Sequence, residues 1–179
     1  MKRVLIMVLA GVFLLACRKF DVGEEQWPTY NDGPSKSEFQ QFYVGRGWRW
    51  GSTHTIKNGR VTNEDYYSVR VGGSTLDYYF GEDELTVFLH PNYRPGAYYY
   101  TRPYEYREGD SSIYINGYKK MTIVSMSNNK DSFEVIDYLG IKSDGTKVFG
   151  LTRYYLMTDE ELAQARDHYQ TNLDTVEGR

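Results

Sequence analysis

The chain has 179 residues, of which 40% are hydrophobic and 25% charged, and its 24 acidic residues outnumber its 21 basic ones. A single domain is expected at this length, and such a chain can bury an apolar core. No cluster of basic residues is present to neutralise a phosphate backbone, so we expect no nucleic-acid partner. With Cys17 as the one cysteine, an intrachain disulfide is excluded, and stability must come from packing.

The first sixteen residues are typical of a cleaved secretory signal. Two basic residues, Lys2 and Arg3, precede an uncharged apolar run over residues 4–16. As a helix this run is about 20 Å long, which is too short for a hydrocarbon core of about 30 Å. The pattern therefore predicts a removed signal peptide over residues 1–16 and not a transmembrane helix.

The end of the apolar run, LLAC, resembles the lipobox of bacterial lipoproteins. Leu14 stands three residues before Cys17, and the small Ala16 stands directly before it. This resemblance implies cleavage before Cys17 and several acyl chains on that residue, which make a lasting anchor because each buried methylene contributes about 0.8 kcal/mol. We therefore expect a lipid-anchored protein of the bacterial cell envelope, on the outer membrane and facing either the periplasm or the cell surface. The alternative is an ordinary secretory signal that ends near a buried cysteine.

Residues 17–38 are predicted to be the lipidated cysteine and a flexible tether. The segment is rich in Gly, Pro, Ser and acidic residues and lacks apolar periodicity. Within it, Trp27 and Tyr30 are the side chains suited to dock back on the domain. Residues 39–173 are expected to form that domain.

Short segments rich in Tyr, Val, Ile, Thr and Phe follow from Gly47 onward, separated by turn residues at spacings near ten, which is typical of an all-β sandwich or barrel. The turn pairs Asn58-Gly59, Gly72-Gly73, Asn116-Gly117 and Asp144-Gly145 supply the positive φ that tight hairpins need. We predict nine strands, over residues 48–56, 62–71, 75–80, 85–90, 98–107, 112–115, 118–127, 132–139 and 147–157. An antiparallel up-and-down meander of eight or nine strands closes most simply into a barrel, because closure removes exposed edges.

The last predicted element is one C-terminal helix, in the segment TDEELAQARDHY. Thr158 is a good N-cap, Glu161 three residues later completes a capping box, and apolar residues follow at helical spacing. This helix is expected either to pack on the outside of the sheet or to plug one mouth of the barrel.

The order of these elements resembles the lipocalin-like domains of bacterial lipoproteins. The resemblance rests on the first strand GRGWRW, the hairpins with NG and DG turns, the segment SSIYINGYKKMTIVSMSNNKDSFEVIDYLG, the closing LTRYYLMT and the final helix. It covers roughly residues 39–169. It implies an eight-stranded barrel whose interior holds a small apolar ligand.

The sequence carries no catalytic motif. His54, His90 and His168 are the three histidines, and no pair has the spacing of metal ligands. No serine stands in a Gly-x-Ser-x-Gly sequence, and no phosphate loop is present. The acidic cluster at residues 82–84 falls in a predicted turn, where we expect it to be solvated. We therefore predict no enzyme activity, no metal site and no cofactor.

The segment GAYYYTRPYEY, residues 96–106, concentrates tyrosine. Side chains alternate between faces of an extended strand, so Tyr98, Tyr100, Tyr104 and Tyr106 are expected to share one face. They either pack across strands or line a site that stacks on a ligand. Pro103 cannot donate to a ladder and marks an edge, a bulge or an opening. The predicted ligand-binding residues are Tyr98, Tyr100, Arg102, Tyr104 and Tyr106.

Two hypotheses follow from different functional classes. The first is a membrane-anchored, non-enzymatic protein that binds a small apolar or glycan-like ligand in its barrel. The second is a structural or interaction lipoprotein whose barrel is filled by its own side chains and which meets another envelope protein. An open interior with inward polar atoms favours the first hypothesis, and a packed interior with an exposed apolar patch favours the second.

Overall fold

The computed structural model describes residues 27, 33–65, 75–90, 98–143 and 145–176. The predicted signal peptide, Cys17, Tyr30 and the turn at Gly72-Gly73 lie outside the described residues. Within the described part, no helix combines the length and apolar character that a membrane span requires.

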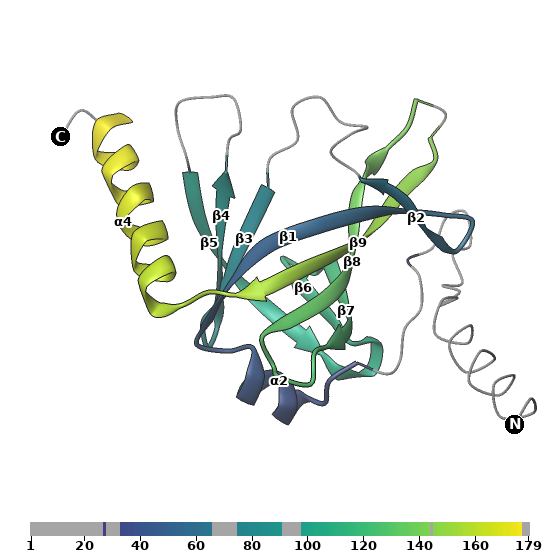
Figure 1. Cartoon of the computed structure of the whole chain (residues 1–179), viewed down its shortest axis with the longest axis horizontal. Coiled ribbons are helices and arrows are strands. Elements are labelled where there is room, and N and C mark those ends of the chain that lie inside the picture. The colour runs from purple at the N-terminus through teal and green to yellow at the C-terminus, as the bar shows by residue number, and fades with distance from the viewer. Residues whose placement is uncertain (1–26, 28–32, 66–74, 91–97, 144, 177–179) are drawn as a thin grey trace, which may run out of the picture.

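Nine antiparallel strands form one sheet (Figure 1). Their bounds are β1 Arg46–Lys57, β2 Arg60–Asp65, β3 Thr75–Phe80, β4 Glu84–His90, β5 Tyr98–Arg107, β6 Ser112–Ile115, β7 Tyr118–Met126, β8 Ser132–Ile141 and β9 Lys147–Leu156. Pairing of β1 with β9 closes an eight-stranded ring, and β2 is an extra strand paired with the far end of β1. The predicted fold, an antiparallel up-and-down barrel with a C-terminal helix, is confirmed.

Local turn chemistry sets two of the hairpins as predicted. Asn58 and Gly59 have φ values of 51° and 69°, and Asn116 and Gly117 have φ values of 52° and 79°. Two consecutive residues with positive φ make the turn whose twist matches that of paired strands. The register of β1 with β2 and of β6 with β7 follows from these turns.

The C-terminal helix α4, Asp159–Val176, covers the outside of the sheet (Figure 1). Its predicted capping box is present, since the Glu161 N–H donates to Thr158 Oγ1 at 3.1 Å and the Thr158 N–H donates to the Glu161 carboxylate at 2.9 Å. Leu162 and Ala165 pack with the outward-facing Phe88. Of the two predicted positions for this helix, the structure shows the outer one.

A second helix, α2 (Lys36–Phe42), was not predicted and closes one end of the barrel (Figure 1). Ser35 and Glu38 form a capping box at its start. Phe39 is 2% exposed and belongs to the main core. The helix begins at Lys36, so its first turn includes the last three residues of the segment predicted to be a tether.

The barrel half next to α2 is filled by the protein's own side chains. Trp48 is fully buried, and its ring lies 4.7 Å from that of Phe133 and 5.7 Å from that of Tyr43. The buried residues of this core are Phe39, Tyr43, Trp48, Tyr78, Phe80, Leu85, Val87, Ile113, Met121, Ile123, Phe133, Val135 and Tyr154. These side chains fill this half of the barrel.

Trp27 docks on the outside of the barrel, as the sequence analysis expected. Its ring centre lies 5.0 Å from that of Phe149 on β9 and 6.4 Å from that of Tyr138 on β8. Lys119 Nζ lies 5.7 Å from the Trp27 ring. The outer cluster that Trp27 joins also contains buried Ile136.

Away from α2 the wall of the barrel divides into two parts. β1 pairs with β3 only over Arg46–Trp48 but stays paired with β9 as far as Ile56. β5 pairs with β6 only over Tyr104–Arg107, although it is paired with β4 from Tyr98 to Pro103. We name the β3–β4–β5 part the first wall and the β1–β9–β8 part the second wall. Figure 1 shows them running in different directions away from α2.

Candidate functional site

One row of cross-strand neighbours identifies the inner face of the first wall. Trp48, Tyr78, Val87 and Tyr100 stand opposite one another on successive strands, so their side chains share a face. The first three are fully buried, which places the row inside the barrel. Tyr100 is nevertheless 39% exposed. Solvent therefore reaches the inner face at β5.

Two of the predicted site residues take part in closing the α2 end. Tyr106 stacks on Phe39 at 4.2 Å, and Tyr104 packs edge-on against the same ring. Their hydroxyls donate to backbone carbonyls, Tyr104 to Gly81 at 2.9 Å and Tyr106 to Pro34. Burial raises the pKa of both phenols to about 12. These two tyrosines therefore have a structural role in this end of the barrel.

The other predicted residues lie farther along β5. Arg102 stands opposite Leu85 and so belongs to the inner face, and its guanidinium lies 5.6 Å from the Tyr100 ring centre. The side chain of Tyr98 lies outside the described residues. Pro103 stands opposite Glu84, and the next residue of β5 pairs with β6. Pro103 thus marks the point at which β5 changes its partner.

The second wall places a carboxyl group inside the barrel. Phe133, Val135 and Asp137 alternate along β8, and the first two are core residues. Asp137 is only 8% exposed, and burial raises the pKa of its carboxyl. The Tyr154 hydroxyl donates to Asp137 Oδ2 at 3.4 Å. Asp137 Oδ1 has no hydrogen-bond partner among the described residues.

A chain of hydrogen bonds leads from Trp50 to Thr152. Trp50 Nε1 donates to Thr53 Oγ1 at 2.9 Å, and the hydroxyls of Thr53 and Thr152 are also 2.9 Å apart. The hydroxyl of Thr152 favours the charged form of the Asp137 carboxyl and so acts to lower its pKa, against the larger effect of burial. Each threonine hydroxyl can both donate and accept, so the bond between Thr53 and Thr152 can run in either direction.

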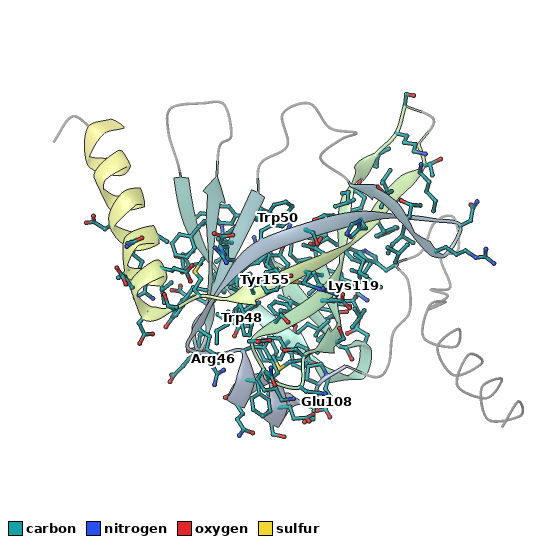
Figure 2. The ribbon with its side chains drawn as sticks, viewed as in Figure 1. Arg46, Trp48, Trp50, Glu108, Lys119 and Tyr155 are labelled. Carbon is teal, nitrogen blue, oxygen red and sulfur yellow. The ribbon has the colours of Figure 1, made fainter. Side chains whose placement is uncertain are left out.

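Two tyrosines connect the first wall to the second wall next to this network. Tyr78 from β3 and Tyr154 from β9 are both buried, and their ring centres are 5.3 Å apart. Burial, and then the charge of Asp137, raises the pKa of both phenols, which stay neutral donors. Figure 2 shows Trp48 close to α2 and Trp50 farther along β1. The candidate site is thus the inner face beyond the Tyr78–Tyr154 contact.

A hollow of about 210 Å³ lies between α2 and the β7–β8 turn. Phe42 and Met126 give it apolar walls, and Lys130 Nζ lies 4.7 Å from the Phe42 ring centre. The buried hydroxyl of Tyr43, another lining residue, has no partner among the described residues. None of the predicted ligand-binding residues lines this hollow.

Asp137 is the main functional candidate that the sequence analysis missed. It occupies the third inward position of a strand whose first two are Phe133 and Val135. A charged residue at an apolar position of a period-two pattern is the signal that would have identified it. Elsewhere in the described part, no three His, Cys, Asp or Glu side chains come together as metal ligands do.

No protein-family model matches this chain, and no curated protein is significantly similar to it. Among solved structures, the chain is similar to a bovine odorant binding protein, a deswapped triple mutant, with a TM-score of 0.38 and 13% sequence identity. The superposition covers 75% of this chain and 85% of that one. This likeness concerns the course of the chain alone.

Proposed function

We propose that this domain is a non-enzymatic binding protein that takes a small, largely apolar molecule between the two walls of its barrel. The observation that carries the proposal is the exposure of Tyr100, because its row mates on the inner face are fully buried. Apolar and aromatic side chains with a few convergent polar atoms are the usual lining of a small-molecule site. Here Tyr100 supplies the former and Asp137 the latter.

A second function is favoured by a different observation. The half of the barrel beside α2 is filled by aromatic rings, as expected for a structural or interaction lipoprotein. The two functions differ in the half away from α2, where the first requires room for a ligand and the second requires none. A glycan-like ligand would use the same inner tyrosines by stacking on them.

The test is a fluorescence titration of the soluble domain from residue 21 with N-phenyl-1-naphthylamine, which is uncharged at neutral pH. We expect saturable binding that Tyr100→Ala weakens several-fold. Tyr155→Ala is a matched control, because Tyr155 is 40% exposed but its neighbour Tyr154 is the inward residue of β9. Native mass spectrometry of the same protein, purified without denaturation, then identifies any molecule that co-purifies.

Lack of saturable binding by a folded domain would refute the proposed function, and so would an equal effect of the two tyrosine variants. In that case the filled-barrel alternative gains support. Membrane attachment through Cys17 is a separate part of the proposal. It predicts that the full chain partitions into detergent and that Cys17→Ser moves it into the aqueous phase.

A further inference from the structure

Asp137 carries a buried carboxyl oxygen on the inner face that lacks a hydrogen-bond partner. Tyr154 donates to Oδ2 at 3.4 Å, yet Oδ1 has no partner among the described residues. An unsatisfied buried acceptor destabilises the folded state, and more so when it is charged. Its presence next to an otherwise ordered network therefore calls for a physical explanation.

The protein's own cations do not supply that explanation. Lys120 is the cation that acts on Asp137, and it favours the charged carboxyl. No described Lys, Arg or His approaches the Asp137 carboxylate within ion-pair distance, because the ion pairs of the described part all lie elsewhere. The missing partner must come from outside the described protein groups.

The chemistry of the surroundings indicates what that partner must offer. Tyr154 donates to Oδ2, and the hydroxyl of Thr152 favours the charged form of the carboxyl. The lone pairs of Oδ1 still need a donor. A cation meets this need best, because a buried carboxylate is stabilised by a charged partner in hydrogen-bond contact.

The neighbouring side chains suit the rest of such a ligand. In the inner row of the first wall Tyr78 and Val87 are fully buried and Tyr100 is 39% exposed, so Tyr100 is the member of the row that a ligand can reach. Aromatic faces attract ammonium groups as well as apolar chains. On the same inner face Arg102 carries a positive charge 5.6 Å from the Tyr100 ring centre, and Asp137 on the second wall is the acidic group.

We propose that the ligand of this barrel is a small apolar amine, whose ammonium group donates to Asp137 Oδ1 and whose apolar part lies against Tyr100 of the first wall. This inference rests on the proposed function and specifies its ligand class. No covalent step is involved. The amine binds as a cation and leaves unchanged.

The experiment compares three competitors of equal chain length, octylamine, octanol and octanoate, as they displace N-phenyl-1-naphthylamine from the soluble domain. Octylamine is expected to bind at least tenfold more tightly than octanol, and octanoate more weakly than both. Asp137→Asn should abolish the preference for the amine while leaving octanol affinity within about twofold. Glu134→Gln is the matched control, because Glu134 is a carboxylate on the same strand that pairs with Arg153 at the surface. It should keep the preference.

Equal affinities for octylamine and octanol in the unaltered protein would overturn the inference and leave the proposed function standing. Absence of fluorophore binding would instead remove the proposed function itself. If Asp137→Asn does not fold, Asp137→Ser provides a second test, since it also removes the carboxylate. Loss of the amine preference in Asp137→Ser supports the inference, and its retention there refutes it.

Discussion

Replacement of Phe39 by alanine tests whether α2 is an integral part of the barrel. Four aromatic rings surround Phe39, with centre distances of 4.2 Å to Tyr106, 5.1 Å to Tyr43, 5.6 Å to Phe80 and 6.1 Å to Tyr104. Phe39 is 2% exposed, so its removal leaves a cavity and not merely a bare surface. The surrounding rings come from three separate elements, which limits how far the site can collapse.

The expected cost follows from these contacts. A buried Phe→Ala change typically lowers the free energy of unfolding by about 3–5 kcal/mol. Each aromatic pair contributes about 0.5–1.5 kcal/mol beyond its buried area, so four neighbours place Phe39 near the upper end of that range. For a domain of this size the loss corresponds to a fall in Tm of about 10–20 °C.

The assay is urea unfolding of the soluble domain, followed by tryptophan fluorescence. Gln40→Ala is the control on the same helix, because Gln40 is exposed and should change the free energy of unfolding by no more than about 0.5 kcal/mol. A cost below about 1.5 kcal/mol for Phe39→Ala, with an unchanged slope in urea, would show that α2 does not close the barrel as described.

Three further predictions concern stability. Asp137→Asn should stabilise the domain at pH 8 in chemical unfolding. Burial raises the pKa of this carboxyl in the folded protein, so the folded protein loses stability as the pH rises from the pKa of the unfolded chain through that of the folded one. The gain should vanish below about pH 4, where the carboxyl is protonated in the folded and in the unfolded protein. Thr158→Ala should cost about 1 kcal/mol by removing the cap of α4, while Thr158→Ser should cost little, and equal melting temperatures for the two would contradict the capping role. Gly117→Ala should lower Tm, because Gly117 has a φ of 79° and alanine is strained there; an unchanged Tm would mean that the β6–β7 turn adapts at no cost.

Most of the sheet was predictable because its signals are local. The ranges 75–80, 98–107 and 112–115 agree with β3, β5 and β6 as observed. Period-two alternation and Asn-Gly turns act within a few residues, and they fix register before any long-range contact forms. The same holds for α4, whose capping box lies within four residues.

Helix α2 shows how a local signal is missed when composition dominates. Ser35 and Glu38 form a capping box, and Phe39 and Tyr43 stand four residues apart as on one helix face. The surrounding Gly, Pro and Ser residues favoured a flexible tether instead. The energy that holds α2 comes from ring contacts with Phe80 and Tyr106, which lie far away in the sequence.

The sequence predicted which face of β5 the tyrosines share, but not that they separate into two groups along the strand. Parity correctly places Tyr100, Tyr104 and Tyr106 on one face of β5. The separation of Tyr100 from the other two depends on the unpredicted α2 and on the change of partner at Pro103. Asp137 could have been noticed from its apolar position in the alternation of β8, but its hydrogen bond with Tyr154 forms only when β8 and β9 are paired. Ligand binding by any of these residues stays a prediction.

The docking of Trp27 limits how far the domain can move from a membrane if Cys17 carries the lipid. Residues 17 and 27 are ten positions apart, and a fully extended chain of that length reaches about 33–36 Å. With Trp27 held against Phe149, the distance between the β8–β9 side of the barrel and the bilayer cannot exceed about one domain diameter, and this limit restricts the orientations of the domain. If Trp27 were released, the next residue attached to the barrel would be Gly33, whose N–H donates to Ser111. The chain from Cys17 to Gly33 could then extend to about 53–58 Å. The contact of Trp27 with the barrel would then determine how far the domain can move from the membrane.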